Sequence, residues 1–303
     1  MIYRVRHRTA YRYADTVMLS HHLLHVTPRA TPAQVRMETR LEISPAPAEQ
    51  PLRQTDYYGN EIAVFNLATP HDRFVVESTS LISVNPPATP DPTDTPAWTE
   101  VAKSIQENLE PSNYAVADFV GRHEFSDIIE QLRDYAAPSL LPDRPLLDAA
   151  MDLNQRIYKD FVYDPKATDV TTSVATVLQK RRGVCQDFAH LMIACLRSFG
   201  LPARYVSGYL RTLPPPGKPR LIGADQSHAW VSIFIPEAGW IDLDPTNACL
   251  AGGDHITLGW GRTYADVAPV RGVITGGGEH QLKVEVDVAP QDSDPAPPDE
   301  LVA

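Results

Sequence analysis

The chain has 303 residues, 43% of them hydrophobic, and a formal net charge of −11 at pH 7. It is long enough for a large core and for about two domains. The acidic balance argues against nucleic acid or an anionic membrane surface as a partner, because both attract clustered basic residues. No apolar run reaches the roughly 18 residues of a membrane helix, and the basic start lacks the apolar stretch of a signal peptide. We therefore expect a cytoplasmic protein.

The three cysteines stand at positions 185, 195 and 249, without a Cys-x-x-Cys pair. So sparse and odd a set argues against a disulfide framework or a thiolate metal site, and fits a reducing compartment. His21, His22 and His25 do not predict a metal site either, because neighbouring residues on a strand point to opposite faces. We expect no metal ion.

The N-terminal region shows the two-residue period of β-strands, with Tyr3 and Val5 on one side of the first strand and arginines on the other. Strands are expected at residues 3–12, 35–43, 52–57, 62–67 and 74–84. Tyr58-Gly59-Asn60 predicts a hairpin turn between the third and fourth. Residues 1–85 are thus expected to form an antiparallel, sandwich-like β domain, followed by a proline-rich linker at 86–97.

Beyond the linker the hydrophobic period lengthens to that of helices, and strands return later. Helices are expected at residues 98–109, 125–136, 145–160 and 184–199, with a short helix ending at Lys180, and strands at 203–211, 228–235 and 240–244. Residues 271–290 are expected to hold one C-terminal strand, at 280–288, after a flexible glycine link at 276–278. Residues 291–303 should form a disordered acidic tail.

Cys185 stands where a turn containing Gly183 leads into the longest apolar stripe. If a helix begins near Cys185, its free N–H groups and positive dipole end favour a thiolate, and Gly183 allows close backbone approach. Asp187, in the first turn, is expected to cap the helix or to hydrogen-bond nearby. Cys195 should pack in the core, and His190 should pack or lie at the surface because it is rotated away from Cys185.

A histidine and an aspartate lie on two neighbouring predicted strands, His228 on the first and Asp244 at the end of the second. If the aliphatic residues of both strands share the core face of a hairpin, His228 and Asp244 share the other face. We expect the helix that begins at Cys185 to cover that face and align thiol, imidazole and carboxylate. Asp242 is the alternative partner of the imidazole; Asp244 is preferred because Asp-Pro-Thr-Asn gives it a turn of its own.

The segments that begin at Arg182, Leu196, Ser227 and Gly239 resemble bacterial transglutaminase-like cysteine proteins. The resemblance is densest over residues 146–248, and the first 84 residues look like the β-rich region that accompanies this core in bacteria. It implies an α+β fold with a papain-like core, in which the nucleophile begins a helix packed on an antiparallel sheet. It also implies a triad of Cys185, His228 and Asp244, with no cofactor. We accordingly assign residues 98–270 to a helical segment plus this catalytic core.

Three functions remain open. A cysteine peptidase or amidase would resolve a thioester with water, whereas a transglutaminase would resolve it with an amine, and we favour hydrolysis because no calcium-loop or pro-segment signature indicates regulated cross-linking. The third is a peptide-binding module without chemistry. A peptide or protein is the expected substrate in each case, and the oligomeric state is left open.

Overall fold

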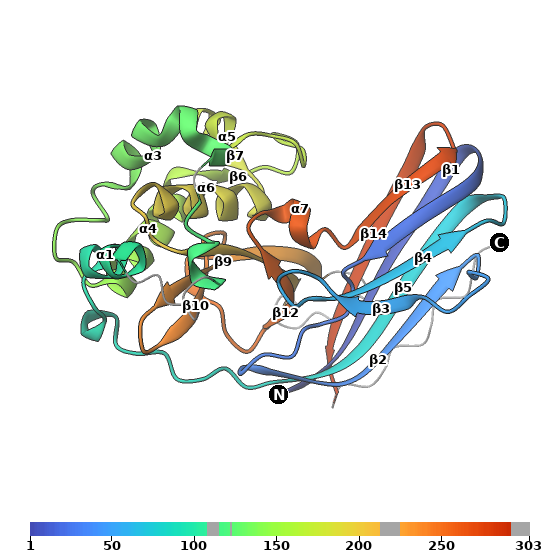
Figure 1. Cartoon of the computed structure of the whole chain (residues 1–303), viewed down its shortest axis with the longest axis horizontal. Coiled ribbons are helices and arrows are strands. Elements are labelled where there is room, and N and C mark those ends of the chain that lie inside the picture. The colour runs from blue at the N-terminus through green and yellow to red at the C-terminus, as the bar shows by residue number, and fades with distance from the viewer. Residues whose placement is uncertain (108–114, 122, 213–224, 292–303) are drawn as a thin grey trace, which may run out of the picture.

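The computed structural model describes residues 1–107, 115–121, 123–212 and 225–291. Figure 1 shows two lobes side by side, one built of strands alone and one that combines helices with a second sheet. Strand β12 and helix α7 lie between them. No helix of the described part of the chain is long and apolar enough to cross a membrane.

The β lobe is an antiparallel sheet folded around its first strand, which runs for 23 residues. Its strands are β1 (Ile2–Leu24), β2 (Gln34–Ser44), β3 (Leu52–Thr55), β4 (Glu61–Leu67), β5 (His71–Val84), β13 (Val270–Gly276) and β14 (His280–Pro290). The first half of β1 pairs with β5 and β14, and its second half pairs with β4 and β13. The predicted N-terminal strands, the hairpin and the last strand are confirmed. β1 continues beyond the predicted strand because its second half finds new partners in β4 and β13 after a register shift between Arg12 and Val17.

The predicted alternation along β1 is also confirmed, since Tyr3 and Val5 are buried. These two side chains belong to a core cluster that includes Tyr209, Ile256 and Leu258 of the second lobe. The two lobes therefore share apolar packing, and burial of this surface stabilises their arrangement by about 25 cal/mol per Å².

The second lobe combines helices with a five-stranded antiparallel sheet in the order β11-β10-β9-β8-β12. Its helices are α1 (Trp98–Glu107), α3 (Ile129–Ala136), α4 (Leu146–Asp160), α5 (Val174–Lys180), α6 (Cys185–Ser198) and α7 (Tyr264–Val267), with 3₁₀ turns η1 (Pro92–Asp94) and η2 (His123–Ile128). Its strands are β6 (Val162–Tyr163), β7 (Arg182–Gly183), β8 (Ala203–Leu210), β9 (Gln226–Ile235), β10 (Gly239–Asp244), β11 (Cys249–Leu250) and β12 (His255–Gly261). The predicted helices and strands are confirmed to within a few residues, except that the first part of the helix expected at 125–136 is the 3₁₀ turn η2. The short strands β6, β7 and β11 were not predicted, nor were β12, α7 and β13.

Helix α6 packs on the aliphatic face of this sheet. Its buried stripe, which includes Leu191 and Met192, belongs to one core cluster with Val231, Ile233 and Leu243 of β9 and β10. The prediction that α6 covers the face of His228 and Asp244 was therefore wrong. The apolar stripe of a helix is stabilised by burial against aliphatic side chains. The face of the sheet that carries His228 and Asp244 offers no such apolar surface.

Candidate active site

Cys185 is the first residue of α6, as predicted, and the loop before it is fixed by a carboxylate. Asp187 Oδ2 accepts the backbone N–H of Val184 at 2.8 Å and the hydroxyl of Thr168 at 2.6 Å. A Cβ at Gly183 would lie 2.6 Å from the same oxygen, so this position needs glycine. The predicted capping role of Asp187 and the close approach at Gly183 are both confirmed.

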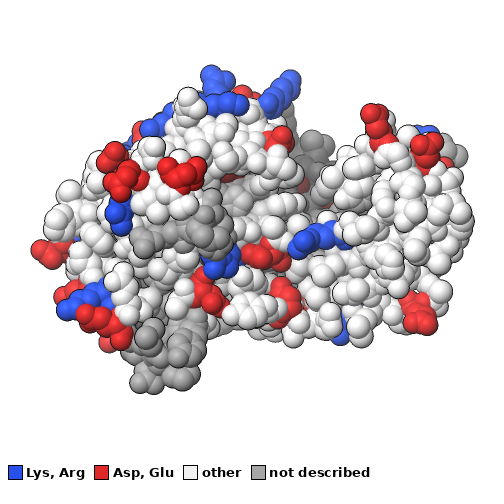
Figure 2. All heavy atoms as spheres, turned by 45° about the horizontal axis from the view of Figure 1, so that its top comes forward, with Lys and Arg blue, Asp and Glu red and all other residues white. Residues whose placement is uncertain are grey.

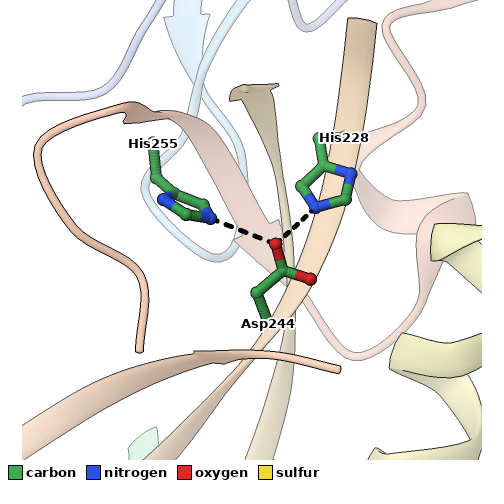
Figure 3. A group of neighbouring side chains, drawn as sticks. All are labelled: His228, Asp244 and His255. Atoms are coloured by element: carbon green, nitrogen blue, oxygen red, sulfur yellow. Dashed lines mark hydrogen bonds and ion pairs between the residues drawn. The ribbon is translucent and has the colours of Figure 1, made fainter. Parts of the chain in front are cut away.

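His228 and Asp244 meet on the polar face of the sheet, as side-chain parity predicted. His228 Nε2 lies 2.7 Å from Asp244 Oδ2, and Figure 3 shows the other ring nitrogen turned away from the carboxylate. That nitrogen, Nδ1, is left for Cys185, which lines the same cavity as His228. Only the N-terminal tip of α6 reaches this histidine. The three predicted site residues are thus brought together.

The surroundings of His228 favour its protonated form. Burial alone would lower its pKa, but hydrogen bonds to Asp244 and Cys185 and the charges of both outweigh burial and raise the pKa to about 10. The carboxylate stabilises the imidazolium, and the imidazolium can then give its proton to a leaving group.

Asp244 is fully buried and accepts hydrogen bonds on both oxygens. Oδ2 accepts from Asn247 Nδ2 at 2.6 Å and from His255 Nε2 at 3.2 Å, besides His228. Oδ1 accepts the backbone N–H of Thr246 at 2.9 Å. Burial alone would raise the pKa of Asp244, but the hydrogen bonds from His228 and His255 outweigh it and lower the pKa well below the ordinary range. The group therefore stays ionised.

His255, at the start of β12, was not predicted as part of the site. Its Nδ1 accepts the backbone N–H of Gly252 at 3.2 Å, so that nitrogen carries no proton. The ring proton must then sit on Nε2, which donates it to Asp244. His255 is a second donor that holds the carboxylate from the side opposite His228 (Figure 3). Asn247 was missed as a donor as well, although it stands in the quoted Asp-Pro-Thr-Asn turn.

The alternative carboxylate, Asp242, is occupied elsewhere. Its Oδ2 accepts the indole N–H of Trp230 at 2.9 Å. Trp230 is fully buried and packs at 5.2 Å, ring centre to ring centre, on His255. His190 packs on Tyr205, and its Nε2 accepts the N–H of Tyr264 at 3.1 Å, which confirms a packing role.

Two other candidates for function are a second cysteine, Cys195, and a group of side chains that could hold a metal ion. Cys195 is fully buried in the core, as predicted, and burial raises its pKa to about 12. Among the described residues, one group could hold a metal ion: His228, Asp244 and His255, whose ligand atoms lie within 4.8 Å of one another. Those atoms are already joined by hydrogen bonds.

Comparisons with known proteins match two stretches of the chain to family models. Residues 133–245 match the transglutaminase-like superfamily, and residues 3–83 match the bacterial transglutaminase-like N-terminal region. An uncharacterized protein of Mycobacterium tuberculosis (strain ATCC 25618 / H37Rv) is 44% identical over 297 residues, which cover 96% of this chain and 94% of that protein. A protein-glutamine gamma-glutamyltransferase of Pseudomonas aeruginosa is 37% identical over 92 residues, 29% of this chain and 14% of that protein.

Among solved structures, a Cytophaga hutchinsonii protein described as a proposed cysteine protease aligns with a TM-score of 0.74 at 19% identity. The alignment covers 98% of this chain and 93% of that chain, so the two share a fold. The expected papain-like, transglutaminase-like α+β fold is confirmed. This chain belongs to the transglutaminase-like superfamily, whose members are typically enzymes.

Proposed function

We propose that the protein cleaves amide or peptide bonds through an acyl-enzyme on Cys185, with His228 as acid and base and Asp244 as the group that orients the imidazole. The observation that carries this proposal is that Cys185 and His228 line one cavity while His228 Nε2 lies 2.7 Å from Asp244 Oδ2. The substrate is a peptide or a protein.

In the first half-reaction, the sulfur of Cys185 attacks the carbonyl carbon and forms a C–S bond. The negative charge moves to the carbonyl oxygen, near the backbone N–H of Cys185, which has no acceptor within the helix because it is the first. The C–N bond then breaks, and the leaving amine takes the Nδ1 proton of His228. The product is a thioester.

In the second half-reaction, water gives a proton to His228 as its oxygen attacks the thioester carbon. The C–S bond breaks, a carboxylic acid leaves, and the thiolate and the imidazolium are restored. Hydrolysis is favoured over transfer to an amine because none of the described residues that line the cavity beside Cys185 is acidic. A lysine side chain would find no carboxylate there.

Acyl transfer to an amine is the second candidate function. It is supported by the segment that is 37% identical to a protein-glutamine gamma-glutamyltransferase. Both functions share the first half-reaction and differ only in the nucleophile that resolves the thioester.

The test is to incubate the full chain with casein peptides in ¹⁸O-labelled water, with and without a fluorescent primary amine. Hydrolysis places ¹⁸O in new carboxyl groups, whereas transfer places the amine in the peptides. Cys185→Ala should abolish either product, and Cys249→Ala, which removes an exposed cysteine, should retain it. Products that persist in Cys185→Ala, or peptide binding without turnover, would contradict the proposal and favour a binding module.

A further inference from the structure

A cavity of about 300 Å³ opens beside Cys185 and His228. This volume is at the low end of the range for ligand sites, enough for a short segment of substrate. Its walls come from both lobes, including β1 and β14 of the β lobe and α6, β8 and β9 of the other. Any molecule that presents a carbonyl to Cys185 therefore also touches the β lobe.

Most of the wall from the β lobe is one face of the ladder between β1 and β14, and Pro269 and Val270 at the start of β13 complete it. Thr9 pairs with Val284, and Tyr11 pairs with Leu282. All four side chains line the cavity. Further along the same face, Val5 lies opposite Val288 in the core that the two lobes share.

Along this face, the buried pair Val5 and Val288 is thus followed by apolar side chains that no described residue covers. Leu282 is 53% exposed and Val284 46% exposed, although both are large apolar residues. Uncovered apolar side chains beside a reactive group are typical of a binding surface. Figure 2 shows most of the β lobe in view as uncharged, with Lys and Arg gathered mainly over the helical lobe.

Among the described residues that line the cavity there is no Asp, Glu, Lys or Arg. The remaining titratable histidine in its lining is His7, which bonds Tyr209 at 2.8 Å and Thr9 at 2.7 Å. Burial lowers the pKa of His7 to about 4, so the ring is neutral at pH 7. A charged substrate side chain would lose its hydration here without gaining an opposite charge.

We propose that this cavity selects the acyl donor by an uncharged, apolar or aromatic side chain next to the reacting carbonyl, and that the wall of β1 and β14 makes the selection. The inference rests on the proposed function, because it places the acyl donor at Cys185. The β lobe is then part of the substrate site and not an appendage of the catalytic core.

The test uses p-nitrophenyl esters of N-acetylated leucine, phenylalanine, lysine and aspartate. These esters acylate a reactive thiol readily because p-nitrophenolate leaves without being protonated. For the wild type, kcat/KM for the leucine and phenylalanine esters should exceed that for the charged esters by about tenfold or more. Val284→Lys should lower the rates for the two apolar esters and raise the ratio of the aspartate to the lysine ester. Val273→Lys is the matched control, since Val273 is 73% exposed on β13 and does not line the cavity.

The outcomes separate this inference from the function beneath it. Acylation of Cys185 is measured by intact-protein mass spectrometry. If no ester acylates Cys185, both the substrate selection and the proposed function are overturned. Acylation at equal rates across the series would overturn the selection alone. An equal shift in Val284→Lys and Val273→Lys would show a general effect of added charge and would remove the β lobe from the site. Melting temperatures check that both variants remain folded.

Discussion

The two faces of the five-stranded sheet differ in what they bury. One face carries Val231, Ile233 and Leu243 and packs on α6. The other carries His228 and Asp244, which bury charge and need hydrogen-bond partners. Many combinations of aliphatic side chains can pack on the first face. The second face requires hydrogen-bond donors placed at the oxygens of Asp244. Substitutions on the two faces should therefore separate stability from chemistry.

The largest effect is expected at Asp244. Asp244→Asn should lower kcat/KM by about 10³-fold or more, because the imidazole loses its oriented tautomer and the charge that stabilises imidazolium. Asp242→Asn is the matched control, since this neighbour on the same face bonds Trp230, and it should stay within about threefold of the wild type. Comparable losses in the two variants would mean that the whole polar face, and not Asp244, supports the reaction.

The next effect is on pH dependence. Because the pKa of His228 is raised to about 10, the imidazolium persists at neutral pH and is lost as the pH rises through that value. We expect kcat/KM to fall by about tenfold per pH unit above it, as the leaving amine loses its proton donor. The profile of residual activity in Asp244→Asn should begin to fall at lower pH. A limb near pH 6.5 in the wild type would show that the carboxylate does not control the imidazole.

A smaller effect is expected at His255, the donor on the far side of Asp244. His255→Ala should lower kcat/KM by about 10- to 100-fold, because a hydrogen bond to a charged group contributes about 1.5–3 kcal/mol. His255→Gln retains an N–H donor and should recover part of the loss. If Gln and Ala variants are equally impaired while melting temperatures match the wild type, His255 does not act by donating to Asp244.

The smallest effect on chemistry is expected on the aliphatic face. Ile233→Val removes one methylene from a fully packed site and should cost about 0.5–1.5 kcal/mol of unfolding free energy. The kcat of the folded fraction should not change. Chemical denaturation gives the first quantity, and active-site titration before the rate measurement gives the second. If kcat falls while the concentration of active sites is unchanged, packing on the aliphatic face affects the chemistry, and the two faces do not separate stability from catalysis.

Much of this architecture could be predicted because its determinants are local. The period of two in residues 3–12 and the apolar stripe after Cys185 each mark an element. Side-chain parity was sufficient to bring His228 and Asp244 to one face, because a hairpin joins their strands directly.

What could not be predicted depends on pairing between distant segments. His255 reaches Asp244 because β12 pairs with β8. Ile256, Leu258 and Trp260 alternate as in a strand, but this short pattern does not reveal which strand is its partner. The partner of β14 is β1, at the other end of the chain. The predicted side of the sheet for α6 was wrong because Cys185, the first residue of the helix, is the one that lies beside His228, whereas the apolar stripe behind it packs on the aliphatic face.

The pairing of β14 with β1 sets an order of events during synthesis. The first strand leaves the ribosome long before its neighbour, and the whole helical lobe is made between them. Domains tend to fold as they emerge, so the thiol and its partners can assemble while one wall of the cavity beside them is still missing. The nascent chain would hold Cys185 without a complete cleft, and the substrate selection proposed above would begin only when the last strand docks.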